Sequence, residues 1–315
     1  MRKIILLGLA FTCSTVAAST SEATSDKPLS AQFGNVASGY NKTIHYPSYS
    51  KPLSANDTGL LNPNTHHTTH LPVVYHSRWQ WLIYGYKEAA IQLNKHHFSY
   101  PDQVELNIDA NTKVESIDVE LINQETREVI AQITNQGSEA TIPTEAHWPD
   151  EILVKARIQF DIGEDAITTS MAFGLPVAQI NRIELPTAKG ADLYIPVNIE
   201  ALQAGLYRVQ ANLFTQNGDP VALLTSSKRL SEGNSSLLEL KVHKSVLLGT
   251  KGPYQLQNVQ IERMTDTPFE KQRRGRSTQE TFPIADFDLN ELTDDAYTPT
   301  QEELDRLKFL NSLSK

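Results

Sequence analysis

The chain has 315 residues, of which 39% are hydrophobic, and this is long enough for two domains that each bury a core. Its 37 acidic residues outnumber its 28 basic residues and give a net charge of −9, so we expect no basic surface for nucleic acid. The only cysteine, Cys13, lies in a segment that we expect to be removed. The mature chain would then have no disulfide, no cysteine nucleophile and no zinc site built on thiolates.

Residues 1–18 have the pattern of a cleaved signal peptide. Two basic residues precede the apolar run 4–10, and small residues that end at Ala18 suit a signal peptidase. The apolar run is too short to span a bilayer, which needs about 20 residues. A lipoprotein anchored through Cys13 is an alternative, although the two residues before it are larger than such a site prefers. We therefore predict an exported protein, periplasmic or extracellular, without a membrane span.

Residues 19–98 are predicted to form an irregular N-terminal region. The stretch 19–71 is rich in Ser, Thr, Asn, His and Pro, so we expect it to be mobile or draped over a neighbouring domain. The helix formers in 87–93 predict a short helix. Before them comes an aromatic segment, which we interpret as a short strand or turn and which contains Trp79, Trp81, Tyr84 and Tyr86.

Two sets of short alternating segments follow. Hydrophobic residues alternate with polar ones from residue 99, which is typical of antiparallel strands with one face on a core. Their spacing predicts one β-sandwich over 99–174 and a second over 175–290. Residues 291–315 form an acidic tail, in which Thr300 and the residues after it predict a short C-terminal helix with a capping box. The expected fold is mainly β, with two immunoglobulin-like antiparallel β-sandwiches.

Part of the second set resembles a known kind of module. Residues 205–209 form a strand, 217–222 a glycine hairpin, and 247–254 a Gly-Pro-Tyr turn before the next strand. This succession resembles the immunoglobulin-like modules of exported bacterial proteins. The layout of the whole chain is similar to an uncharacterised family of exported bacterial proteins with tandem modules of this type. The resemblance implies a fold and a compartment, and it implies no activity and no catalytic residue.

Three histidines form the first candidate metal site. Neutral imidazole is a good ligand for zinc, and His66, His67 and His70 lie close together in the sequence. However, the surrounding Thr and Asn residues do not favour a helix, and the glutamate base of an H-E-x-x-H enzyme is absent. A polar exposed loop is the favoured interpretation, and a zinc site is the alternative.

A second candidate metal site lies near the C-terminus. Asp286, Asp288 and Asn290 are spaced like the start of a calcium loop. The Gly and Glu that an EF-hand needs at its sixth and twelfth positions are replaced by Glu291 and Tyr297. A solvated acidic loop is favoured over a calcium site, and we expect no cofactor.

The aromatic segment allows two interpretations. Its rings could stack on sugars if they were exposed, but aromatic residues at alternate positions more often pack. Trp79 and Trp81 would share one face of a strand, and we predict that this face packs on the first sandwich. The basic run 271–276 is predicted to be an exposed loop, which is also a type of segment that proteases cut.

The sequence has no G-x-S-x-G elbow and no phosphate-binding glycine loop. We therefore predict a non-catalytic exported protein that binds a protein or a glycan. The candidate ligand-binding residues are Trp79, Trp81, Tyr84 and Tyr86. The alternative is a metal-dependent hydrolase that uses His66, His67 and His70. The sequence specifies no oligomeric state.

Overall fold

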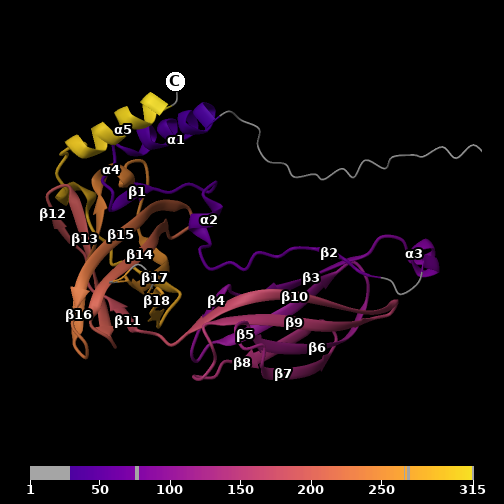
Figure 1. The fold of residues 1–315 in the computed structure, drawn as a ribbon. Helices are drawn as coiled ribbons and strands as arrows, with labels where there is room; N and C mark the ends of the chain where they lie inside the picture. The colour runs from indigo at the N-terminus through magenta and orange to yellow at the C-terminus, as the bar shows by residue number, and fades with distance from the viewer. Residues whose placement is uncertain (1–28, 75–77, 266, 268–269, 314–315) are drawn as a thin grey trace, which may run out of the picture. The chain divides into compact units, whose positions relative to one another are not determined.

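The computed structural model describes residues 29–74, 78–265, 267 and 270–313, so the predicted signal peptide and Cys13 lie outside it. Contacts divide the chain into two units. One unit, residues 43–300, holds two β-sandwiches (Figure 1). The other comprises residues 1–42 and 301–315 and holds most of α1 (Leu29–Thr43) and all of α5 (Gln301–Leu313). In the part of the chain that the structure describes, no helix is long and apolar enough to cross a bilayer.

The first sandwich pairs a four-stranded sheet with a five-stranded sheet. The four-stranded order is β2-β3-β5-β8 and the five-stranded order is β4-β10-β9-β6-β7. Neighbouring strands are antiparallel except β4, which runs parallel to β10. The strands are β2 (Leu71–Pro72), β3 (Glu88–Leu93), β4 (His97–Ser99), β5 (Gln103–Ala110), β6 (Val114–Asn123), β7 (Val129–Gln136), β8 (Glu139–Pro143), β9 (Glu151–Phe160) and β10 (Gly163–Gly174).

The second sandwich has a six-stranded and a five-stranded sheet. The strand order of the six-stranded sheet is β1-β15-β14-β17-β18, and β20 also pairs with β17. The strand order of the five-stranded sheet is β12-β13-β11-β19, and β16 also pairs with β13. The strands are β1 (Ser50–Pro52), β11 (Ala178–Ile183), β12 (Thr187–Lys189), β13 (Asp192–Ala201), β14 (Gly205–Thr215), β15 (Pro220–Leu230), β16 (Ser235–His243), β17 (Tyr254–Arg263), β18 (Arg273–Arg274), β19 (Arg276–Ser277) and β20 (Thr281–Pro283). Short helices are α2 (Thr58–Leu61), α4 (Lys244–Leu247) and the 3₁₀ turn η1 (Leu289–Glu291).

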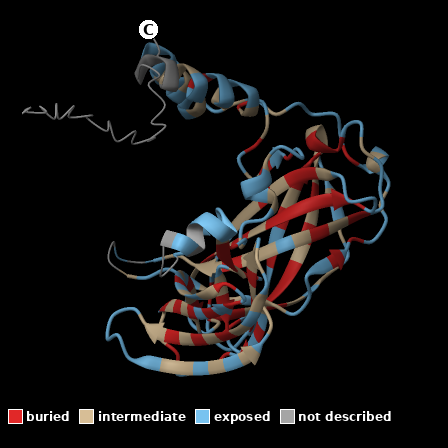
Figure 2. Ribbon diagram, turned by 90° about the vertical axis from the view of Figure 1, so that its right-hand side faces the viewer, coloured by how far each residue is buried: buried red, intermediate tan, exposed pale blue. Residues whose placement is uncertain are grey.

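The alternating segments form the cores of the sandwiches, as predicted. In β9, Ile152, Val154, Ala156 and Ile158 are fully buried and the residues between them are not, so one face of the strand covers the core. The same alternation runs through the first half of β14. Buried positions concentrate inside the two sandwiches (Figure 2). The predicted mainly β, sandwich fold and the short C-terminal helix are confirmed.

One buried tyrosine fixes the start of β14. Tyr207 is completely buried, and its hydroxyl hydrogen bonds with the carbonyl oxygens of Gln203 at 2.7 Å and Val177 at 2.9 Å. A tyrosine near the start of a strand whose hydroxyl reaches backbone a few residues upstream is a device of immunoglobulin-type sandwiches. The Gln203 carbonyl lies where the chain turns from β13 into β14, so the hydroxyl ties this turn to the residue before β11.

The N-terminal region is more ordered than we predicted. Residues 29–43 form helix α1, and β1 joins the edge of a sheet in the second sandwich, where Ser50 lies opposite Leu224. Ser50 is completely buried and its hydroxyl accepts a hydrogen bond from the backbone N–H of His243. The description of 19–71 as mobile or merely draped is therefore wrong for this segment, because backbone pairing holds it. Composition alone does not reveal an edge strand of three residues.

The predicted helix over 87–93 is also wrong, because these residues form strand β3. Ala89, Ala90 and Ile91 are buried between the strands β2 and β5. Pairing on both sides outweighs the helix propensity of Lys, Glu and Ala, which is worth only a few tenths of a kcal/mol per residue. The first sandwich consequently begins upstream of residue 99.

The basic run 271–276 is not a simple exposed loop. It contains β18, which pairs with β17, and the start of β19, which pairs with β11. Between them, a Cβ on Gly275 would lie 2.4 Å from the carbonyl oxygen of Ala178. The chain therefore crosses between the two sheets at a point where only glycine fits.

Candidate functional site

The predicted aromatic segment forms a protruding loop on the first sandwich. Strands β2 and β3 pair at its base, and the N–H of Val73 donates to the carbonyl oxygen of Lys87 at 2.9 Å. The next residue, Val74, donates its N–H to the Asp165 carboxylate at 2.7 Å. Its base is therefore held by one hydrogen bond between its two strands and by a second from Val74 to a side chain of β10. In Figure 1 the loop carries α3 (Arg78–Tyr84) beyond the ends of β9 and β10.

The segment is a helix, where we predicted a strand or turn. Helix α3 ends before Gly85, whose φ of +68° places it in the left-handed region that glycine adopts readily. Positions two apart diverge on a helix, whereas they would share a face on the strand that we predicted. The expected common packing face therefore does not exist.

The described residues between Val74 and Tyr86 are exposed, so the prediction that the aromatic cluster packs on the sandwich is wrong for the described rings. Six of the 19 exposed large hydrophobic residues in the described chain fall within residues 74–86. The side chain of Trp81 is outside what the structure describes. We call the six the aromatic tip, and with their exposed fractions they are Val74 (65%), Trp79 (72%), Leu82 (67%), Ile83 (71%), Tyr84 (43%) and Tyr86 (64%).

The three candidate metal ligands do not converge. His66 is buried, and its Nε2 lies 2.8 Å from the hydroxyl of Thr169 on β10, while burial lowers the pKa of its imidazole. His70 faces Asp109, with 3.5 Å between Nε2 and Oδ2, and His67 is exposed. No three His, Cys, Asp or Glu side chains in the described residues are placed to hold one metal ion.

The acidic segment near the C-terminus has a local structural role. The Asp288 side chain caps η1, because its Oδ1 accepts hydrogen bonds from the backbone N–H and the side-chain amide of Asn290, both at 2.9 Å. These contacts use the carboxylate within its own turn. The spacing that suggested the start of a calcium loop is thus the spacing of a capped turn.

A polar groove of about 550 Å³ is the second surface that the structure offers. Its walls come from the extended segment 62–65, from β4 and the residues around it, and from β17 and residues 274–281. Most lining side chains are amides and hydroxyls, and charged groups of both signs are present. Burial, followed by the effect of Arg274, lowers the pKa of His97 in this groove to about 4, so its imidazole is neutral at pH 7.

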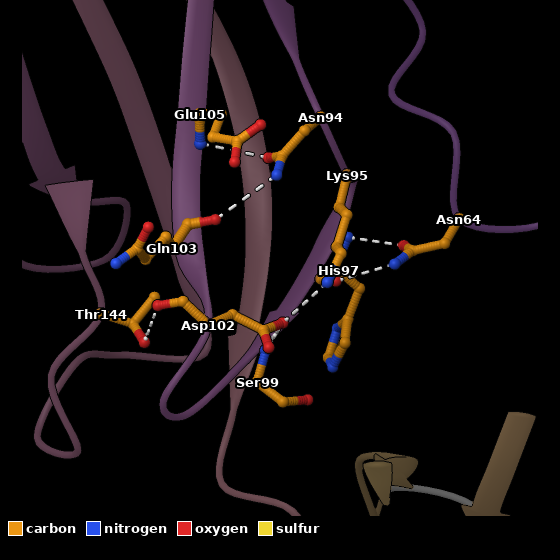
Figure 3. Close-up of polar contacts among 9 residues, drawn as sticks. All are labelled: Asn64, Asn94, Lys95, His97, Ser99, Asp102, Gln103, Glu105 and Thr144. Carbon is orange, nitrogen blue, oxygen red and sulfur yellow. Dashed lines mark hydrogen bonds and ion pairs between the residues drawn. The ribbon is translucent and has the colours of Figure 1, made fainter. Parts of the chain in front are cut away.

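The polar side chains on the first-sandwich wall of the groove hold its own backbone together (Figure 3). The Asn64 amide accepts from the backbone N–H of His97 at 2.8 Å and donates to its carbonyl oxygen at 2.9 Å. The Asp102 carboxylate accepts from the N–H of Ser99 at 3.1 Å and lies 3.4 Å from the ammonium group of Lys95. These groups are already engaged, so the groove offers a ligand fewer polar partners than its composition suggests.

No protein family and no curated protein matches the sequence. Among solved structures, the chain is similar to a DUF4785 family protein from Legionella pneumophila, with 16% identity, a TM-score of 0.42, and coverage of 56% of this chain and 53% of that one. The match thus spans about half of the Legionella protein.

Two further structures are similar at lower TM-scores and lower identity. The BSP domain of a biofilm-associated protein has 11% identity and a TM-score of 0.21, over 62% of this chain and 30% of that one. Murine CEACAM1b has 12% identity and a TM-score of 0.25, over 62% of this chain and 98% of that one. At these values the similarities carry no argument about function, which depends on the site itself.

Proposed function

We propose that the chain is a non-catalytic binding protein at or outside the cell envelope, and that it contacts its partner with the aromatic tip. The observation that carries this proposal is the exposure of the tip. Large apolar side chains that are scattered singly on a surface need no explanation, but a group of them on one loop marks an interaction site. Here a rigid sandwich holds such a group on a loop whose base is held by the hydrogen bonds of Val73 and Val74.

The composition of the tip suits binding rather than chemistry. Trp and Tyr are the residue types enriched where binding energy is concentrated in protein interfaces. Exposed aromatic rings also offer flat faces to sugar rings. The sequence left protein and glycan partners open, and the two would use the tip differently. A glycan would stack on Trp79 or Tyr86, whereas a protein would also bury Leu82 and Ile83.

No observation favours the metal-dependent hydrolase. The described histidines of the cluster contact different groups, namely the Thr169 hydroxyl for His66 and the Asp109 carboxylate for His70. Metal analysis of the purified chain provides the check. Stoichiometric zinc that disappears when His66 and His70 are both replaced by Ala would support the hydrolase instead.

A matched pair of variants tests the binding proposal. Leu82→Asp/Ile83→Asp places two carboxylates on the tip, and Leu185→Asp/Leu248→Asp makes the same change at two equally exposed positions, 74% and 70%, on the second sandwich. Co-sedimentation with isolated bacterial envelopes measures binding to proteins, glycans and lipids together. We expect the wild-type chain and the control variant to sediment and the tip variant to stay in solution. A tip variant that sediments as well as the wild type would contradict the proposal.

A further inference from the structure

The aromatic tip mixes two kinds of apolar side chain that prefer different depths in a lipid surface. Trp and Tyr are enriched at the boundary between headgroups and hydrocarbon, where a ring and a polar group are both accommodated. Leu and Ile partition into the hydrocarbon itself. The tip presents Trp79 and Tyr86 beside Leu82 and Ile83, all between 64% and 72% exposed. A surface of this composition suits the boundary between lipid headgroups and hydrocarbon better than it suits a sugar ring, which would use only the aromatic residues.

The charges around the tip add a preference for anionic headgroups. Arg78 begins α3, and Lys87 closes the loop at its base. No Asp or Glu occurs between Asp57 and Glu88, although acidic residues outnumber basic ones over the whole chain. The carboxylate of Asp165 lies at the base of the loop, where it accepts a hydrogen bond from the backbone N–H of Val74. Each Lys or Arg near an anionic membrane surface contributes about 1 kcal/mol to binding.

Helix α3 has seven residues, and at 1.5 Å per residue it is about 10 Å long. A helix that lies in the membrane interface runs along the surface and buries its apolar face by about 5–10 Å. The length of α3 therefore sets how much apolar surface it offers to the membrane, not how deep it inserts.

From these observations we infer that the aromatic tip is a docking element for an anionic lipid surface. The side chains of Trp79, Leu82, Ile83 and Tyr86 insert at the headgroup boundary, and the positive charges that Arg78 and Lys87 bring to the loop attract the lipid phosphate groups. The inference rests on the proposed function, since it names the partner that the tip contacts. It supplies a peripheral attachment in a chain whose described helices do not span a membrane.

Vesicle binding by the full chain tests the inference. One set of vesicles contains phosphatidylglycerol and phosphatidylethanolamine, and a second contains only phosphatidylcholine. We expect binding to the anionic set, with a blue shift of the tryptophan emission and quenching by brominated acyl chains. The chain has three tryptophans, and Trp148 is buried in the first sandwich, so quenching reports Trp79 and Trp81. Leu82→Asp/Ile83→Asp should reduce binding at least tenfold, whereas Leu185→Asp/Leu248→Asp should leave it unchanged.

Replacing the cations separates the charge contribution. Arg78→Gln should weaken binding to anionic vesicles about fivefold, which corresponds to ~1 kcal/mol, and should have little effect with phosphatidylcholine. Absence of binding by the wild-type chain to either set of vesicles would overturn the inference, as would equal binding by the tip variant. If the chain binds envelopes through the tip but no vesicles, the lipid inference fails while the proposed function stands. A protein or glycan on the envelope is then the partner.

Discussion

Two tryptophans of the first sandwich give opposite predictions for the same substitution. Trp79 keeps 72% of its surface exposed, so folding buries only about a quarter of it. Of the ~250 Å² that a tryptophan can bury, this is ~70 Å². At ~25 cal/mol/Å² that area is worth ~1.8 kcal/mol, and the true figure is smaller because unfolded chains also bury surface. We therefore expect Trp79→Ala to lower the free energy of unfolding by about 1 kcal/mol or less.

Trp148 is the control, because it is 5% exposed and its ring lies 5.6 Å from that of Phe173. Trp148→Ala leaves a cavity in the core and should cost about 3–5 kcal/mol. Urea unfolding followed by circular dichroism measures both values. A loss of 3 kcal/mol or more for Trp79→Ala would mean that the indole packs on the sandwich, and the aromatic tip would then not be a free surface.

Three other substitutions test the fold. Gly275→Ala places a Cβ 2.4 Å from the carbonyl oxygen of Ala178 and should cost about 1–3 kcal/mol in urea unfolding, whereas an unchanged midpoint would refute the close crossing. Tyr207→Phe removes the hydroxyl bond to Gln203 and should cost about 1–2 kcal/mol, with the protein still folded. Burial lowers the pKa of His97 to about 4, so the unfolded chain takes up the proton first, and stability should fall as the pH drops from about 6.5 to 4. His97→Gln should remove part of that fall, by about 2 kcal/mol, and an identical pH dependence would contradict this assignment.

The long alternating segments could be recognised from the sequence because burial on one face imposes a period of two. Ile152 to Phe160 and Tyr207 to Leu213 show this period and form β9 and β14. The short segment Glu88–Leu93 could not be assigned in the same way. Its Ala and Glu residues favour a helix locally, and pairing with β2 and β5 makes it a strand.

Proline in β13 shows how tertiary context changes the meaning of a residue. Pro196 in an alternating run suggests an edge strand, yet β13 lies inside its sheet, between β16 and β11. The carbonyl oxygen of Pro196 accepts from the N–H of Glu184, one residue past the end of β11 at Ile183. The pairing between β13 and β11 ends at Val197, one residue after the proline. The N–H that Pro196 lacks is therefore not needed for a hydrogen bond between these two strands.

The residues of the candidate site were visible in the sequence, but their exposure was not. Trp79, Tyr84 and Tyr86 stand out by type, although the sequence suggested a strand or turn where the structure has helix α3. Whether another element covers these rings depends on the whole fold, so the sequence favoured packing, which is the commoner arrangement. The pairing of Asn64 with His97 across 33 residues is likewise a product of the fold, since neither residue signals its partner.

Hydroxyl-radical footprinting of the full chain on isolated bacterial envelopes tests the central claim most directly, because oxidation rates report side-chain exposure residue by residue. In the free chain, Trp79, Leu82, Ile83 and Tyr86 should react readily, in line with their exposure. On binding, we predict that their rates fall severalfold while those of Leu185 and Leu248 do not change. Protection of other surfaces, with the rates at the aromatic tip unchanged, would contradict the claim that the tip is the binding surface.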